Sequence, residues 1–255
     1  MEIKELNAEY WNGRASSYSD VNKWELAGES RDSWKSVISA CIGSHYDNRA
    51  PADISVLDVG CGPGFFAVIL TELGYKVTAV DLSEEMLAEA KLNAGELSES
   101  ISFMRMNAEA LDIDDDSFDV VISRNLTWNL PHPDTAYAEW CRALKPGGLF
   151  INFDSNWYHY LYEEEKRAGY DADRARSEEL HLGDQNVGEN FDVMEDIARE
   201  MPLSRIDRPV WDIAVLTALG MKTAADTEVW QRVWTDQEKI NFSSTPMFMI
   251  TAVKR

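Results

Sequence analysis

The stretch VLDVGCGPGF, from Val56 to Phe65, decides the fold of this chain. An apolar run of strand character ends there in three glycines two positions apart, Gly60, Gly62 and Gly64. The apolar residues of a helix follow at once, in the sequence FFAVILTELG. A strand that passes through a glycine-rich turn into a helix brings backbone N–H groups and the positive end of the helix to one point. The pattern therefore predicts a site for a nucleotide-like ligand with an anionic group.

The chain after this stretch alternates strand-like and helix-like segments. Buried strands are expected at 54–60, 75–81, 101–106, 118–123 and 149–154. These strands are apolar throughout, which is typical of a parallel sheet with helices on both faces. A helix over 208–220 and strands within 221–230 and 245–255 should complete the sheet.

Two segments lie outside this alternation. Residues 1–50 are helical in pattern and rich in Trp and Tyr, so we expect a helical N-terminal cover before a core over 51–255. Residues 155–205 are polar, acidic and aromatic with no strand pattern. We expect them to form a mostly helical lid, inserted after the fifth strand.

Composition limits the possible partners. The chain has 255 residues, and its 24 basic and 45 acidic residues give a net charge of −21. Such a field repels nucleic acid phosphates, so neutral or cationic small molecules are easier partners. No signal peptide or apolar run of about 20 residues is visible, which predicts a cytoplasmic protein with no membrane partner.

The sequence shows no metal-ligand pattern. The three cysteines are far apart and form no CxxC pair, and the four histidines lack metal-like spacing. The acidic run from Asp112 to Asp116 lacks the pattern of a calcium loop. We therefore expect no metal ion.

A carboxylate at the end of the second strand narrows the choice of ligand. Asp81 follows Gly60 by 21 positions and can accept hydrogen bonds from both hydroxyls of a ribose. A dinucleotide register, GPGFFA from Gly62, is possible, but Asp58 would then lie beside a pyrophosphate of like charge. An acidic residue there suits a ligand with an amino group and a positive centre, such as S-adenosylmethionine.

Several motifs now stand in order: LDVGCGPGFFAVILTELGYKVTAVDLSEEMLAEAK, NAEALDIDDDSFDVVISRN and EWCRALKPGGLFI. Together they resemble the class I S-adenosylmethionine-dependent methyltransferases, closely over 53–154 and more loosely over the last 50 residues. The resemblance implies a Rossmann-like, doubly wound α/β fold. Its sheet would have seven mostly parallel strands, with the last strand antiparallel.

The resemblance also implies which residues bind the cofactor. The glycine loop and Asp58 would surround its methionine part, Asp81 its ribose, and the residues after the third strand its adenine. The family often has aspartate where Asn107 stands, and an amide can still meet the adenine amino group. In the N-terminal segment EYWNGRASSYSD, tyrosine and arginine would lie near the cofactor carboxylate, although an ordinary amphipathic helix is an equal alternative. The expected cofactor residues are Tyr10, Arg14, Tyr18, Asp58, Gly60, Gly62, Gly64, Asp81, Leu82, Met86, Asn107, Ala108, Glu109, Arg124 and Asn125.

The acceptor should be met by residues after the fourth and fifth strands. Methyl transfer needs positioning and, for an amine or hydroxyl acceptor, a general base. Substrate contacts are expected at Trp128, Asn129, Asp154 and Trp157. Candidate catalytic residues are His132, Tyr158 and His159. Packing within the core or the lid is the alternative for each of them.

The sequence therefore predicts an enzyme that transfers a methyl group from S-adenosylmethionine to a small molecule and releases S-adenosylhomocysteine. We expect a monomer or a homodimer. Two alternatives stay open. One is a nicotinamide-dependent oxidoreductase that uses the GPGFFA register. The other is a regulatory protein that binds S-adenosylmethionine without catalysis.

Overall fold

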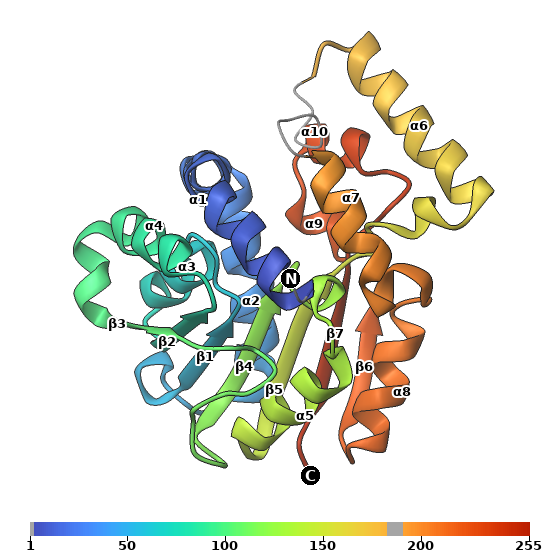
Figure 1. Cartoon of the computed structure of the whole chain (residues 1–255). Coiled ribbons are helices and arrows are strands. Elements are labelled where there is room, and N and C mark those ends of the chain that lie inside the picture. Colours follow the sequence, from blue (N-terminus) through green and yellow to red (C-terminus); the bar gives the residue numbers. More distant parts are fainter. Residues whose placement is uncertain (1–2, 183–190) are drawn as a thin grey trace.

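A computed structural model of the chain describes residues 3–182 and 191–255. Its centre is a seven-stranded sheet in the order β3-β2-β1-β4-β5-β7-β6 (Figure 1). The strands are β1 (Ser55–Val59), β2 (Lys76–Asp81), β3 (Ile101–Arg105), β4 (Phe118–Arg124), β5 (Leu144–Asp154), β6 (Lys222–Asp226) and β7 (Phe248–Val253).

The strands run in the predicted relative directions, and their order creates a crevice for a ligand. β1 pairs in parallel with β2 and β4, and β4 pairs in parallel with β5. β7 runs antiparallel to both β5 and β6, as the sequence predicts for the last strand. The chain moves outward from β1 in one direction and returns to β4 on the other side. Ligands of open α/β sheets bind beyond the carboxyl ends of the strands at such a switch point.

Helices cover both faces of the sheet. One face packs against α2, α3 and α9, and the other against α5 and α8. The helices are α1 (Ile3–Ala27), α2 (Ser30–His45), α3 (Phe65–Glu72), α4 (Glu84–Ala94), α5 (Pro133–Ala143), α6 (Glu164–Glu179), α7 (Phe191–Glu200), α8 (Val210–Ala218), α9 (Trp230–Val233) and α10 (Asp236–Asn241). Short 3-10 turns are η1 (Pro51–Asp53), η2 (Gly95–Ser100), η3 (Thr127–Asn129), η4 (His159–Leu161) and η5 (Pro202–Arg205).

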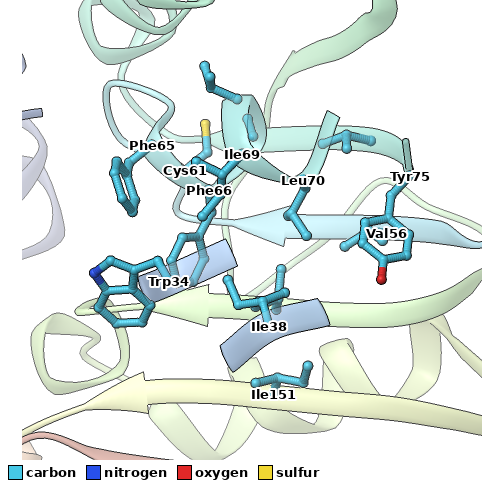
Figure 2. Packing of buried hydrophobic residues seen from close by; sticks show 14 of the residues in the cluster. Trp34, Ile38, Val56, Cys61, Phe65, Phe66, Ile69, Leu70, Tyr75 and Ile151 are labelled. Atoms are coloured by element: carbon cyan, nitrogen blue, oxygen red, sulfur yellow. The ribbon is translucent and has the colours of Figure 1, made fainter. Parts of the chain in front are cut away.

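An aromatic cluster fixes α2 and α3 on their face of the sheet. Trp34 of α2 is 1% exposed, and its ring meets those of Phe66 and Phe153 edge-on, with centroids 5.3 and 5.0 Å apart. Figure 2 shows Trp34 and Ile38 of α2 facing Phe66 and Ile151. Edge-on aromatic pairs of this kind add to the free energy gained from burial. The cluster holds the glycine loop, which leads into α3, in a rigid position.

The N-terminal and inserted segments lie at the carboxyl edge of the sheet. α1 crosses this edge, and η4, α6, α7 and η5 stand on the same side, with α6 projecting outward (Figure 1). The inserted segment 155–205 holds no strand in its described part, and its residues 183–190 lie outside the described residues. Its division from the core as a lid stays a prediction.

Two boundaries differ from those expected. β5 begins at Leu144 and includes the KPGG turn, with a register shift against β4 after Phe118. The helix expected over 208–220 is shorter, because α8 covers Val210–Ala218 with Pro209 as its N-cap. Within 3–182 and 191–255, no helix combines the length and apolar character that crossing a membrane requires.

Candidate functional site

The glycine loop is shaped by both its backbone and its neighbours. Gly60 and Cys61 donate their backbone N–H groups to the carbonyl of Val80, at 2.8 and 3.0 Å, which ties the loop to β2. Gly64 has φ +93°, and a Cβ there would lie 3.0 Å from the Cβ of Ala90 on α4. Packing between helices therefore excludes a side chain at this third glycine.

Gly62 lies at the open part of the loop. Its φ is +51°, and a Cβ there would have only the ring of Tyr18 within 4 Å, at 3.8 Å. Its backbone N–H donates to Oδ2 of Asp81 at 2.8 Å. The backbone of Gly62 can therefore approach a ligand closely, in the space between the loop and α1.

Asp81 is held in place at the end of β2. Its Oδ1 accepts the N–H of Ser83 at 2.9 Å, and its Oδ2 accepts the N–H of Gly62. A carboxylate offers about four acceptor positions, so about two stay available for a ligand. Burial raises the pKa of Asp81, while the hydrogen bonds from Ser83 and Gly62 oppose that shift.

A cavity of about 840 Å³, partly open to solvent, lies between this loop and α1. We call it the loop cavity. Ten of the expected cofactor residues line it: Tyr18, Gly60, Gly62, Asp81, Leu82, Met86, Asn107, Ala108, Arg124 and Asn125. Residues that sequence reasoning missed also line it, namely Asn7, Ala8, Trp11, Val59, Val80, Ser83, Met106, Leu126 and Leu130.

A second cavity of about 1090 Å³, also partly open, adjoins the first. We call it the aromatic cavity. It brings together Tyr10 and Arg14 of α1 with three residues expected near the acceptor, Trp128, Trp157 and Tyr158. Other residues of its wall come from distant segments, including Tyr160, Tyr170, Arg174, Met194, Asn241 and Phe242.

The two cavities share Trp11, Tyr18 and Asn125 in their walls. Asn125 adopts φ +55°, which is uncommon for a residue with a side chain, and its N–H donates to the carbonyl of Phe153 at 2.8 Å. Its Oδ1 is buried and has no hydrogen-bond partner. Unusual backbone conformations of this kind cluster at functional sites. The junction of the two cavities is therefore a candidate functional site.

The sequence was compared with known proteins. Residues 57–152 match the family model described as a methyltransferase domain. The chain contains a methyltransferase domain. Ubiquinone biosynthesis O-methyltransferases are similar to it. The protein from Alkalilimnicola ehrlichii is 31% identical over 128 residues, 49% of each chain, and that from Thiobacillus denitrificans is 36% identical over 119 residues, 45% of this chain and 51% of the relative. The chain thus spans about half the length of the curated relatives it matches.

Solved structures share the fold of this methyltransferase domain. The YcgJ protein from Bacillus subtilis aligns with a TM-score of 0.53 at 18% identity, over 83% of this chain and 96% of that one. A putative S-adenosylmethionine-dependent methyltransferase from Listeria monocytogenes aligns with a TM-score of 0.52 at 19% identity, over the same shares. The fold is the Rossmann-like fold of class I methyltransferases, which confirms the prediction from the sequence.

Asp58 lies directly behind the glycine loop of the methyltransferase domain. It is 1% exposed, it does not line the loop cavity, and its Oδ2 has no hydrogen-bond partner. Burial raises the pKa of Asp58 to about 7. A buried carboxyl oxygen without a partner is costly, and a positive group in the loop cavity would stabilise the charged form of Asp58.

Arg124 and Glu25 join α1 to the end of β4. Nη1 and Nη2 of Arg124 donate to Oε1 and Oε2 of Glu25 at 2.8 and 2.9 Å, and the guanidinium lies 4.5 Å from the ring centre of Phe65. This bidentate pair is nearly buried and holds α1 over the loop cavity. The side chain of Arg124 thus holds α1 against the end of β4.

Three further residues expected to contact the cofactor or the substrate lie elsewhere than predicted. Glu109 does not line the loop cavity, because its Oε1 accepts the backbone N–H of His132 at 2.7 Å. Asn129 lines the loop cavity instead of the aromatic cavity, and its Oδ1 accepts the indole N–H of Trp11 at 2.7 Å. Gly64 serves the packing of α3 on α4 instead of lining a cavity.

Asp154, expected as a substrate contact, lines neither the loop cavity nor the aromatic cavity. Its Oδ2 accepts the N–H of Trp128 at 3.1 Å and pairs with Nη1 of Arg208 at 2.5 Å. Arg208 also pairs with Asp212 at 2.6 Å, and Tyr137 donates to Asp212. All three charged side chains are buried, so Asp154 belongs to an ion cluster inside the fold.

The candidate catalytic residues differ in placement. His132 is exposed and His159 is buried, and neither lines the loop cavity or the aromatic cavity. Neither histidine therefore belongs to the walls of the two cavities, and a general-base role for either stays a prediction. Tyr158 lines the aromatic cavity, with its ring 4.9 Å from that of Trp128. Burial raises the pKa of Tyr158, so its phenol keeps its proton at neutral pH.

Proposed function

We propose that this chain transfers the methyl group of S-adenosylmethionine to a small acceptor molecule and releases S-adenosylhomocysteine. The observation that carries the proposal is the junction at Trp11, Tyr18 and Asn125, where the loop cavity meets the aromatic cavity. A cofactor in the first cavity would present its reactive end to an acceptor in the second. The methyltransferase domain supports the same reaction.

The residues of the loop cavity fit this cofactor. Asp81 has acceptor positions for two ribose hydroxyls, and Gly62 leaves its backbone accessible. The unpaired Oδ2 of Asp58 lies behind the loop, where the positive amino group of a methionine would stabilise its charge. When bound, S-adenosylmethionine supplies a methyl group that an acceptor lone pair takes as the carbon–sulfur bond breaks and its electrons stay on sulfur.

The walls of the aromatic cavity favour a small, planar acceptor. Trp128, Tyr158 and Trp157 line this cavity, and the ring centres of Trp128 and Tyr158 lie 4.9 Å apart. Such walls position a flat molecule and exclude water, which are the main protein contributions to a direct displacement. The net charge of −21 supports a small molecule over a nucleic acid. We further propose that α1 and the segment 155–205 act as cover and lid.

The test is turnover with a panel of small acceptors. We expect release of S-adenosylhomocysteine, followed by mass spectrometry, with planar hydroxylated or amino compounds and not with tRNA. Trp128→Ala should raise KM for the acceptor and leave the affinity for S-adenosylmethionine unchanged. Trp24→Ala, at an exposed position of α1, is the matched control.

Three results would contradict the proposal. Methylation of tRNA would show a nucleic acid substrate, and oxidation of NADH would favour the oxidoreductase. Tight binding of S-adenosylmethionine with no turnover across the panel would indicate a non-catalytic binding protein.

A further inference from the structure

Three side chains converge at a place outside both cavities. Nδ1 of His159 lies 3.9 Å from Oε1 of Glu163 and 3.7 Å from Oδ1 of Asp207. One nitrogen or oxygen atom from each residue lies within 4.8 Å of the other two. The imidazole is 3% exposed, whereas the two carboxylates reach solvent. A buried ligand atom and two accessible charges thus face a common point.

The hydrogen bond on the other ring nitrogen assigns the tautomer of His159. Nε2 lies 2.9 Å from the carbonyl oxygen of Ile206. A carbonyl only accepts, so Nε2 carries the hydrogen and donates it. Nδ1 is buried with no hydrogen-bond partner. In the neutral imidazole its lone pair faces two carboxylates, an arrangement of three electron-rich atoms that a cation would stabilise.

The distances distinguish a proton from a metal ion. A shared proton requires a nitrogen–oxygen distance of about 2.7–3.2 Å, which is shorter than either distance found here. Ligands of tetrahedral zinc have bonds of about 2.0–2.2 Å, which places neighbouring ligand atoms roughly 3.4 Å apart. Distances of 3.7 and 3.9 Å are close to that spacing, and side-chain rotations at the two exposed carboxylates would close the difference.

We propose that His159, Glu163 and Asp207 bind a divalent transition-metal ion of the zinc type, with water in the remaining position. The hydrogen bond from Nε2 to a backbone carbonyl is one of the arrangements that orient metal-binding histidines. Lys166 and Arg208 line the small cavity beside His159. Arg208 is paired with buried aspartates, and no described ion pair joins Lys166 to Glu163 or Asp207.

The metal would connect two segments that are far apart in the sequence. His159 belongs to η4 and Glu163 is the N-cap of α6, whereas Asp207 comes shortly before α8. Tyr160, next to His159, lines the aromatic cavity. A bound ion would therefore hold this wall of the cavity against the core. The proposal of a metal site does not rest on the proposed methyl transfer.

The experiment is a zinc titration of the chelator-treated full chain by calorimetry, with Co²⁺ absorption as a second probe. We expect one ion per chain, cobalt bands typical of mixed nitrogen and oxygen ligands, and a higher Tm with zinc. The double variant Glu163→Gln/Asp207→Asn should bind zinc at least about tenfold more weakly, because two of three protein ligands lose their charge. His159→Gln, if it folds, should also bind zinc more weakly than the unchanged chain.

The matched control is Glu165→Gln/Asp192→Asn, which removes the same charge at two other exposed positions. It should bind zinc as the unchanged chain does. Equal affinities for the two double variants would show that binding occurs elsewhere and would overturn the proposal. Failure of the unchanged chain to bind zinc or cobalt would overturn it as well.

Discussion

Replacing Asp81 with alanine should weaken the binding of S-adenosylhomocysteine by two orders of magnitude. In the structure, Asp81 accepts N–H groups from Gly62 and Ser83 at 2.8 and 2.9 Å and has acceptor positions left for two ribose hydroxyls. Hydrogen bonds to a charged group contribute about 1.5–3 kcal/mol each. Losing two such bonds costs at least about 3 kcal/mol, which corresponds to an increase in Kd of roughly 100-fold.

Asp81→Asn should bind S-adenosylhomocysteine with an affinity between those of Asp81→Ala and the unchanged chain. Its amide oxygen still accepts hydrogen bonds but carries no charge, so we expect a loss of about tenfold. The assay is calorimetric titration of each variant with S-adenosylhomocysteine, and Asp112→Ala, at an exposed position, is the control. If Asp81→Ala binds within about threefold of the unchanged chain, the role assigned to this carboxylate is wrong.

Further predictions concern stability. Arg208→Met leaves two buried aspartates without their counter-charge and should lower the free energy of unfolding by about 3–5 kcal/mol in urea titrations. Burial raises the pKa of Asp58 to about 7. The folded protein therefore binds a proton that the unfolded chain releases above about pH 4, so stability falls as the pH rises from there to about 7. Asp58→Asn should remove this decrease of stability with pH. An equal pH dependence of the free energy of unfolding for the variant and the unchanged chain, measured in urea titrations, would contradict this prediction. Gly64→Ala should lower Tm, because the residue has φ +93° and the new Cβ would lie 3.0 Å from Ala90. Gly43→Ala, in a helix with no atom near its Cβ, should raise Tm.

The fold and the loop cavity could be predicted because their determinants are local in the sequence. Apolar strands ending in glycine or aspartate fix both the sheet and the polar groups at its carboxyl edge. Asp81 is the last residue of β2, and Gly62 and Asn107 lie shortly after β1 and β3, so their positions in the loop cavity follow from the order of the strands. The same logic identified Asn125 after β4.

The aromatic cavity could be predicted only in part, because its wall is assembled from distant helices. Tyr170 on α6 and Phe242 after α10 have no local pattern that distinguishes them from core residues. Asp154 ends β5, but its carboxylate forms an ion pair with Arg208, which lies far along the chain. The contact between His159 and Asp207 likewise depends on tertiary structure. Pairings of this kind are not visible in sequence spacing.

The most direct test of the central claim is calorimetric titration of the ligand-stripped chain with S-adenosylmethionine, S-adenosylhomocysteine and NADH. The loop cavity has an acceptor for ribose hydroxyls in Asp81, and the buried Asp58 behind the glycine loop has an unpartnered oxygen, Oδ2. We therefore expect both adenosyl ligands to bind with a stoichiometry of one and NADH to give no saturable heat. Binding of NADH alone, or of none of the three, would contradict the assignment of the loop cavity as a cofactor site for methyl transfer.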